Sequence, residues 1–301
     1  MLRLIVGLFI ALRFEISIAQ TATPTVEITG LAPLYADLDR LLITYRNDGL
    51  RLSALIVKPK HAARPLPVLI TNHGFHPDPP RYGFINSQEN ERPGKYYGSI
   101  PTAFARRGFA VIMADYRGHN TSEGYEFTRL PNAPDLYATD VLALLSALPI
   151  LDGLRSDCIF VWGHSMGAEV SLRTIVSHEG IRAVSLWSLA SSVKDWSAIL
   201  DCAQQLPPIA IRHSINDSVS PVINSYNLEL YLRSRGVNPE TTFEDSTLHF
   251  LKASFSNAQS RRTHSFSRST LVPLSAKNTN EGGICSTKTC TALTRITACD
   301  K

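Results

Sequence analysis

The chain lacks the cysteine and histidine spacing of a zinc site. Its 301 residues include five cysteines, but there is no Cys-x-x-Cys pair and no pair of histidines nearby at the spacing of a zinc site. We therefore expect no metal centre. The odd number of cysteines leaves at least one thiol outside any set of disulfides. Cys158 stands in an apolar run, and we expect it to be a buried free thiol.

A basic surface for nucleic acid is also missing. The formal net charge is +4, but the last 51 residues hold eight basic and two acidic side chains, so the rest of the chain carries −2. A nearly neutral body without a basic stripe does not fit nucleic-acid binding. The longest apolar run near the start, residues 4–12, is too short to span a bilayer.

The first residues have the three parts of a secretory signal peptide. Arg3 precedes the apolar run, and Ser17-Ile18-Ala19 forms a small-x-small cleavage site. We expect residues 1–19 to be removed before Gln20 and the protein to be secreted or periplasmic. The alternative is an N-terminal strand or helix of a cytosolic protein.

Apolar β-branched runs alternate with segments of helical periodicity between residues 41 and 243. This alternation predicts an α/β fold, a doubly wound and mostly parallel sheet with helices on both faces. We expect one domain over residues 20–252, with residues 20–37 as a surface lead-in and a Ser/Thr-rich, poorly ordered tail over 253–301. The expected strands are 41–46, 52–57, 67–71, 109–114, 158–162, 182–187, 209–212 and 241–243, and the expected helices are 100–107, 134–148, 166–177 and 221–235.

A Gly-x-Ser-x-Gly motif lies between the apolar run ending at Trp162 and the helix expected from Met166. A strand before and a helix after the motif are the context of a nucleophile elbow, the tight turn that presents a serine hydroxyl. Gly163 and Gly167 would leave room for neighbouring backbone where a Cβ would collide. The sequence therefore predicts Ser165 as a catalytic nucleophile.

A serine needs a base to take its proton and a carboxylate to orient that base. In folds with this elbow the acid and then the histidine follow the serine, each in a loop after a late strand. Asp217 and His249 have that order and placement. Glu244 and Asp245 are rival acids too near His249 in sequence, and Asp115 is expected to fix a loop.

An oxyanion hole should combine two backbone N–H groups, one just after the nucleophile and one from the loop after an early strand. Met166 supplies the first, and Phe75 in the sequence His73-Gly74-Phe75 is placed for the second. An ordinary turn at the strand end is the alternative for this loop.

The segment from Pro77 to Ser99 is a polar insert with aromatic residues. These residues could line a pocket for the acyl or leaving group, or they could fasten the loop to the body of the protein. The candidate substrate-binding residues are Tyr82, Phe84, Tyr96 and Tyr97.

Taken together, the motifs at 73–75, 115–119, 163–167, 217–225 and His249 resemble the α/β-hydrolase fold. Within it, the chain looks most like the catalytic domain of the prolyl oligopeptidase (S9) family and its stand-alone esterase and dienelactone-hydrolase-like relatives. The resemblance implies cofactor-free acyl hydrolysis by Ser165, Asp217 and His249. Ser214 replaces the glycine that relatives usually have after the histidine of the acid loop, and the amphipathic helix that usually follows the catalytic histidine is not evident.

We therefore expect a secreted serine hydrolase that acts on a small ester or a short peptide through an acyl-enzyme on Ser165, without a cofactor. A peptidase of this kind usually binds the substrate N-terminus with carboxylates, for which only Glu89 and Glu91 are candidates, and this favours esters. A non-catalytic ligand-binding protein on the same scaffold is the alternative. The sequence does not indicate an oligomeric state.

Overall fold

A computed structural model of the chain describes residues 26–31, 35–81, 99–190, 197–200 and 206–249. The signal peptide predicted over 1–19, the aromatic residues Tyr82, Phe84, Tyr96 and Tyr97, and the tail over 253–301 all lie outside these ranges.

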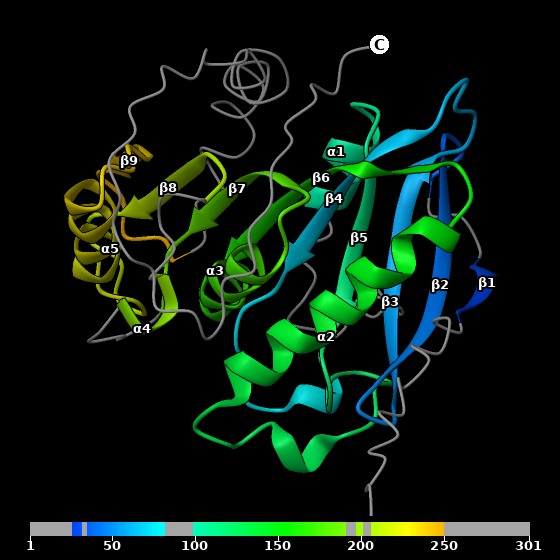
Figure 1. The fold of residues 1–301 in the computed structure, drawn as a ribbon, viewed down its shortest axis with the longest axis horizontal. Coiled ribbons are helices and arrows are strands. Elements are labelled where there is room, and N and C mark those ends of the chain that lie inside the picture. The colour runs from blue at the N-terminus through cyan, green and yellow to red at the C-terminus, as the bar shows by residue number, and fades with distance from the viewer. Residues whose placement is uncertain (1–25, 32–34, 82–98, 191–196, 201–205, 250–301) are drawn as a thin grey trace, which may run out of the picture.

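Nine strands form one mixed sheet in the order β1-β2-β3-β5-β4-β6-β7-β8-β9 (Figure 1). The first three pairings in this order are antiparallel, and every pairing from β5-β4 to β8-β9 is parallel. The predicted mostly parallel sheet is confirmed. The strands are β1 (Glu27–Leu31), β2 (Leu38–Asn47), β3 (Leu50–Pro59), β4 (Leu66–Asn72), β5 (Ala110–Asp115), β6 (Leu154–His164), β7 (Ile181–Trp187), β8 (Ile209–Ser214) and β9 (Glu240–Glu244).

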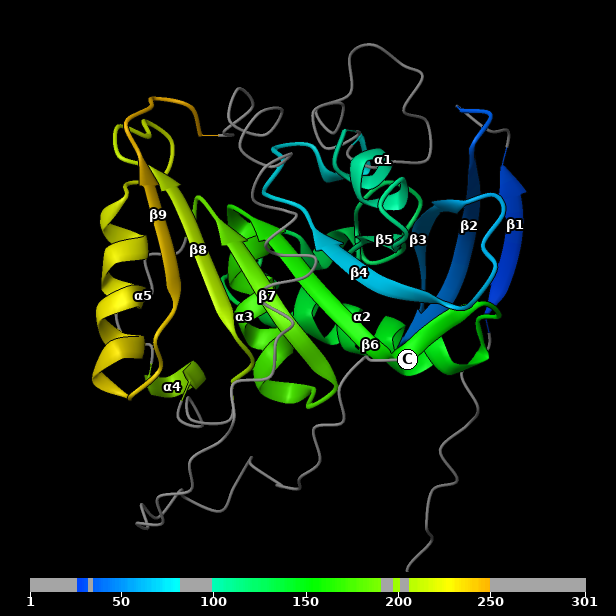
Figure 2. The ribbon, with the colours of Figure 1, turned by 90° about the horizontal axis from the view of Figure 1, so that it is seen from above.

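Helices cover both faces of this sheet (Figure 2). One face packs on residues of α2, α3 and α5, and the other packs on residues of α1, so there are two apolar cores. The side chains of β3 alternate between them: Ala54 and Ile56 join the first core, and Leu55 and Val57 join the second. The helices are α1 (Ser99–Ala105), α2 (Ala133–Ala147), α3 (Met166–Ser177), α4 (Ser197–Leu200) and α5 (Ile223–Ser234), with short 3-10 turns η1 (Pro79–Arg81), η3 (Tyr125–Phe127) and η4 (Leu148–Ile150).

One strand and one α-helix were not predicted. Residues Glu27–Leu31 form the edge strand β1 rather than a surface lead-in, and they pair antiparallel with β2. Four of the five residues of β1 are exposed, so the strand leaves no buried pattern in the sequence and is held by backbone hydrogen bonds. Helix α4 is a single turn, too short to have a recognisable periodicity.

The segment Ala133–Ile150, which comprises α2 and η4, is apolar enough to span a membrane, with a mean hydropathy of 1.2 over 18 residues. Half of this segment is buried inside the protein, where α2 packs on α3 and β2. A core helix of an α/β domain has this composition, and we interpret α2 in that way.

The structure also corrects the prediction that Cys158 is a free thiol. Its side chain is buried in β6, as predicted, but it is disulfide-bonded and not a free thiol. The other four cysteines, Cys202, Cys285, Cys290 and Cys299, lie outside the described residues.

Candidate active site

Ser165 stands at a strained turn between β6 and α3. Its φ of 56° and ψ of −125° are unusual for a residue with a side chain, as expected of a nucleophile elbow. The glycines on either side of it have the predicted steric role. A Cβ on Gly163 would lie 2.3 Å from the carbonyl oxygen of Gly167, and a Cβ on Gly167 would lie 2.1 Å from that of Asn72. Only glycine therefore fits at either position.

The approach of Gly167 to Asn72 brings the end of β4 against the first turn of α3. Asn72 reinforces this contact, since its Nδ2 donates to the hydroxyl of Ser171 (2.9 Å), which donates to the carbonyl of Gly167 (2.7 Å). The N–H of Met166 belongs to the first turn of α3, where N–H groups have no partner within the helix. The loop after β4 and the start of α3 are thus adjacent, as an oxyanion hole requires.

His73 orients the peptide that carries the second expected N–H donor. Its Nδ1 lies 2.9 Å from the carbonyl oxygen of Gly74, which can only accept, so Nδ1 carries the proton. In a trans peptide the carbonyl and the N–H point in opposite directions, so the N–H of Phe75 is directed away from the His73 ring. Burial, followed by the neighbouring His119, lowers the pKa of His73 well below its usual value, so the ring is neutral.

Asp217 and His249 are brought together as predicted. Nδ1 of His249 donates to Oδ2 of Asp217 across 2.7 Å, although the residues lie on the separate loops after β8 and β9. This is the contact that fixes the tautomer of a catalytic imidazole and leaves Nε2 free to accept a proton.

The Asp217 carboxylate is held in its ionised form. Its Oδ1 accepts hydrogen bonds from the backbone N–H groups of Val219 (2.8 Å) and Ser220 (2.9 Å). Burial alone would raise the pKa of Asp217, but the bonds from Ser220, His249 and Val219 outweigh it and lower that pKa.

His213 is a neighbour of Asp217 whose contact the sequence did not reveal. Its Nε2 donates to the carbonyl of Ser220 (2.9 Å) and lies 3.4 Å from Oδ2 of Asp217, while its Nδ1 accepts from the hydroxyl of Ser225 (2.7 Å). Burial lowers the pKa of His213, so it is a neutral, fully buried donor beside the acid. The sequence analysis placed His213 on the loop that carries Asp217, whereas the structure places it near the end of β8, and the sequence could not show where its side chain points.

The backbones of Ser165 and His249 are connected by hydrogen bonds through Trp187 and Ser188. Within the described residues the Ser165 hydroxyl makes no hydrogen bond, and catalytic hydrogen bonds of this kind often tighten only when substrate binds. The backbone N–H of Ser165 donates to the carbonyl of Trp187 (2.9 Å), and the adjacent Ser188 donates to the carbonyl of His249 (2.7 Å).

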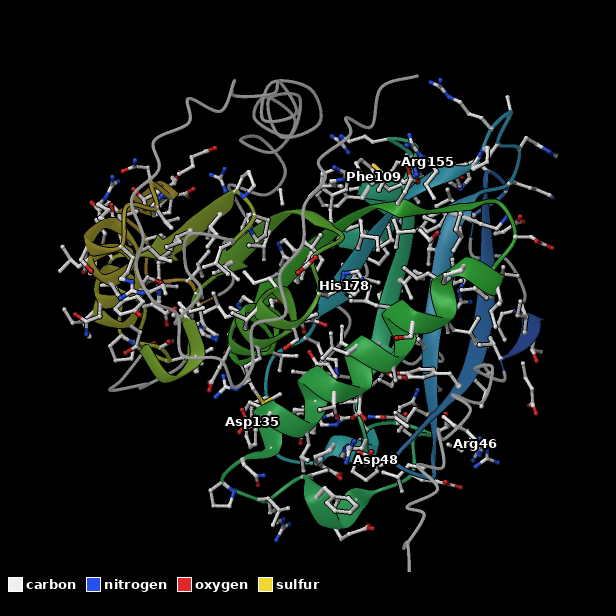
Figure 3. All side chains as sticks on the ribbon, viewed as in Figure 1. Arg46, Asp48, Phe109, Asp135, Arg155 and His178 are labelled. Atoms are coloured by element: carbon white, nitrogen blue, oxygen red, sulfur yellow. The ribbon has the colours of Figure 1, made fainter. Side chains whose placement is uncertain are left out.

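The loop from Asp115 to Asn120 is held by hydrogen bonds and ion pairs to carboxylates. Asp115 accepts from Asn120 Nδ2 (2.9 Å), as predicted for a loop-fixing residue. Arg117, 2% exposed, pairs with buried Asp140 at 2.7 Å and with Asp48 at 2.8 Å, the latter in the β2-β3 turn (Figure 3). The rival acid Asp245 instead accepts from Asn216 Nδ2 (3.0 Å).

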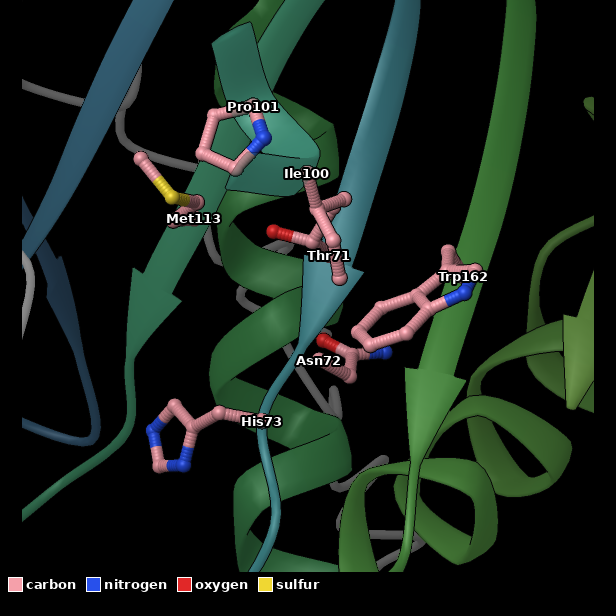
Figure 4. Close-up of a pocket in the computed structure, with 7 residues that line it drawn as sticks. All are labelled: Thr71, Asn72, His73, Ile100, Pro101, Met113 and Trp162. Atoms are coloured by element: carbon pink, nitrogen blue, oxygen red, sulfur yellow. The ribbon is translucent and has the colours of Figure 1, made fainter. Parts of the chain in front are cut away.

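A narrow space, too tight to admit a water molecule, lies between α1 and the ends of β4, β5 and β6 (Figure 4). In Figure 4 the Asn72 side chain lies beside the Trp162 ring, and the His73 ring turns to the other side. The space is lined by Thr71, Asn72, His73, Ile100, Pro101, Met113 and Trp162. Within the described part of the chain no group of three or more His, Cys, Asp or Glu side chains could hold a metal ion.

Comparison with solved structures shows the same fold in several hydrolases. An acetyl xylan esterase from Paenibacillus sp. R4 aligns over 80% of this chain and 89% of its own, with a TM-score of 0.59 and 14% identity. Est1E from Butyrivibrio proteoclasticus, with ferulic acid bound, aligns over 75% of this chain and 99% of its own, with a TM-score of 0.55 and 18% identity. The acylaminoacyl peptidase of Pyrococcus horikoshii aligns over 77% of this chain but only 39% of its own, with a TM-score of 0.56 and 14% identity.

A search of curated protein sequences finds no significant match. Residues 48–199 match the model of the X-Pro dipeptidyl-peptidase (S15) family, a range that includes Ser165 but ends before Asp217 and His249. The predicted α/β-hydrolase fold and serine-hydrolase class are confirmed, whereas the particular likeness to the S9 family is not. The chain is a serine hydrolase of the α/β-hydrolase fold and belongs to the X-Pro dipeptidyl-peptidase (S15) family.

Proposed function

We propose that the protein hydrolyses carboxylic esters through an acyl-enzyme on Ser165. The contact between Asp217 and His249 carries this proposal, because a buried carboxylate bonded to an imidazole is what activates a serine hydroxyl. Ser165 Oγ attacks the carbonyl carbon while Nε2 of His249 takes its proton. The N–H groups of Phe75 and Met166 stabilise the oxyanion of the tetrahedral intermediate.

The intermediate then collapses and the bond to the leaving group breaks. His249 returns its proton to the departing oxygen, which leaves as an alcohol. A water molecule next attacks the acyl-enzyme, with His249 again taking a proton, and the carboxylic acid is released with Ser165 regenerated. No cofactor enters either half of the reaction.

The surroundings of the proposed catalytic residues favour an apolar substrate. Three large apolar side chains are exposed beside them: Phe75 in the oxyanion loop (67%), Val219 in the acid loop (69%) and Leu248 next to His249 (45%). Exposed apolar side chains around a site commonly mark the surface that contacts a ligand. We propose that they contact an apolar acyl or alcohol group, together with Tyr82, Phe84, Tyr96 and Tyr97, which lie outside the described residues.

Short peptides are the second candidate substrate, because the matching family is described as X-Pro dipeptidyl-peptidases. A peptidase must bind the substrate's amino terminus, and the candidate carboxylates Glu89 and Glu91 lie outside the described residues. The two substrates are distinguished by comparing p-nitrophenyl esters with an Xaa-Pro p-nitroanilide, using Ser165→Ala as the blank. We expect kcat/KM for the ester to exceed that for the anilide. A larger value for the anilide would contradict the esterase proposal.

We further propose that the protein is exported after removal of residues 1–19. The disulfide at Cys158 supports this, because disulfides persist in oxidising compartments. Expression of the full chain in a secreting host, followed by N-terminal sequencing of the medium or periplasmic fraction, should give a chain beginning at Gln20. An uncleaved chain confined to the cytosol would contradict export.

A further inference from the structure

The backbone beside the proposed base is bound by three buried side chains. The hydroxyl of Ser188 donates to the carbonyl of His249 (2.7 Å), and Nε2 of His164 donates to the same oxygen (3.0 Å). The hydroxyl of Ser214 donates to the carbonyl of the preceding residue, Leu248 (2.6 Å). Two successive carbonyls of the histidine loop thus receive three hydrogen bonds.

The three donors come from the ends of three neighbouring parallel strands. His164 is the last residue of β6, Ser188 follows the end of β7, and Ser214 is the last residue of β8. Each is at most 2% exposed. A buried donor held at a strand end loses little further freedom when it bonds, so the position of its acceptor is well defined.

Two of these donors are also attached to the nucleophile. His164 is covalently joined to Ser165. Ser188 follows Trp187, whose carbonyl accepts the backbone N–H of Ser165 (2.9 Å). The same strand ends therefore fix the backbone of Ser165 and the backbone of His249 relative to each other.

His164 donates to this carbonyl through a proton on Nε2, since the carbonyl can only accept, so the neutral ring must be the Nε2–H tautomer. Burial lowers its pKa to about 3, against a smaller opposing effect of the bond to His249. The donor is therefore present throughout the pH range in which a serine hydrolase works.

We propose that Ser188, Ser214 and His164 are positioning residues that set the distance and angle between His249 and Ser165. This inference rests on the proposed function of those two residues. The three hydrogen bonds hold the carbonyls of Leu248 and His249 in a fixed position against the sheet, whether or not a substrate is bound. The three residues bind the backbone of the loop, and the ring of His164 also packs against the ring of His249, with 4.8 Å between the ring centroids.

The test compares Ser188→Ala, Ser214→Ala and the double variant with a matched control, Thr174→Val. Thr174 is fully buried and donates to the carbonyl of Val170 (2.9 Å) inside α3, so its replacement also removes one buried hydroxyl bond. We expect kcat to fall about tenfold in each serine variant and about 10²-fold in the double variant, with KM within about twofold. Thr174→Val should lower the melting temperature to a similar extent but leave kcat unchanged. Ser214→Thr keeps the hydroxyl and should recover most of kcat.

A second readout does not depend on turnover. In the wild type, the Nδ1–H of His249 should give a low-field proton NMR resonance because it is bonded to Asp217. In the folded double variant this resonance should broaden or vanish as the loop moves and the proton exchanges with water. A sharp, unshifted resonance in the double variant, or a kcat no lower than in Thr174→Val, would overturn the positioning role. A wild type without esterase activity but with the expected change in this resonance would contradict the proposed function and leave the positioning role supported.

Discussion

The carbonyl oxygen of Asn72 occupies the place where a side chain at position 167 would begin, 2.1 Å from the Cβ that an alanine would carry there. This one contact joins the end of β4 to the first turn of α3. It therefore also determines how close the proposed oxyanion loop lies to Ser165, the proposed nucleophile.

Gly167→Ala should destabilise the fold, because the obstructing atom is backbone and cannot rotate away. We expect a loss of about 3 kcal/mol or more in the free energy of unfolding, measured by urea denaturation. Gly30→Ala is the matched control, since a Cβ at Gly30 has no atom within 4 Å, and its effect should be within about 0.5 kcal/mol. Equal stability of the two variants would show that α3 and β4 are not packed this closely.

Asp217→Asn should leave the protein folded and lower kcat by about 10⁴-fold, as expected when a catalytic imidazole loses the carboxylate that fixes its tautomer. Steady-state ester hydrolysis with circular dichroism of both proteins gives the measurement. Asp245→Asn is the control, because Asp245 contacts Asn216 and not His249. If Asp245→Asn lost more activity than Asp217→Asn, the acid would have been assigned wrongly.

Asp140→Asn should be strongly destabilising, because among the described residues it leaves the buried Arg117 guanidinium with the exposed Asp48 as its one charged partner. Breaking a buried ion pair on one side costs about 3–5 kcal/mol. Asp157→Asn breaks the exposed pair with Arg155 and should cost less than about 1 kcal/mol. Chemical denaturation of both variants tests this, and similar values would mean that the Arg117 pair is not structurally important.

Stability should fall in mildly acidic solution because several histidines are buried as neutral rings. Burial lowers the pKa of His119 to about 4, and the bond from its ring to the carbonyl of Arg117 opposes this only in part. Between that value and 6.5 the unfolded chain binds a proton that the folded chain does not, so stability is complete above pH 6.5 and is lost as the pH falls. At pH 5.5 the loss from one such histidine is about 1 kcal/mol.

His119→Asn removes that proton uptake while its amide can still donate to Arg117. Urea midpoints measured from pH 7.5 to 5.5 should therefore fall less steeply for the variant than for the wild type. Parallel curves would show that His119 is not buried as a neutral ring.

The parts predicted from the sequence are those governed by local sterics or by chain order. The elbow at Ser165 could be predicted because its two glycines and the flanking strand and helix are adjacent in the chain. Asp217 and His249 could be predicted because the order of the strands determines which loops meet. Both rules need only the sequence.

The remaining features depend on where side chains point in the folded protein, which the sequence does not show. The bond from Ser188 to His249 joins residues 61 positions apart, and nothing in the sequence distinguishes Ser188 from other serines. The nearest signal was Ser214, which replaces an expected glycine and whose hydroxyl binds the carbonyl of Leu248. Strand β1 was missed because its residues are mostly exposed, and the disulfide at Cys158 because spacing does not define pairing.

The most direct test of the account is active-site labelling with a fluorophosphonate, followed by intact-mass measurement and peptide mapping. The wild type should take up one equivalent of reagent, located on the peptide that contains Ser165. Folded Ser165→Ala should take up none. Label on another residue, equal labelling of the two proteins, or a folded wild type that does not react would contradict the assignment of Ser165 as the nucleophile.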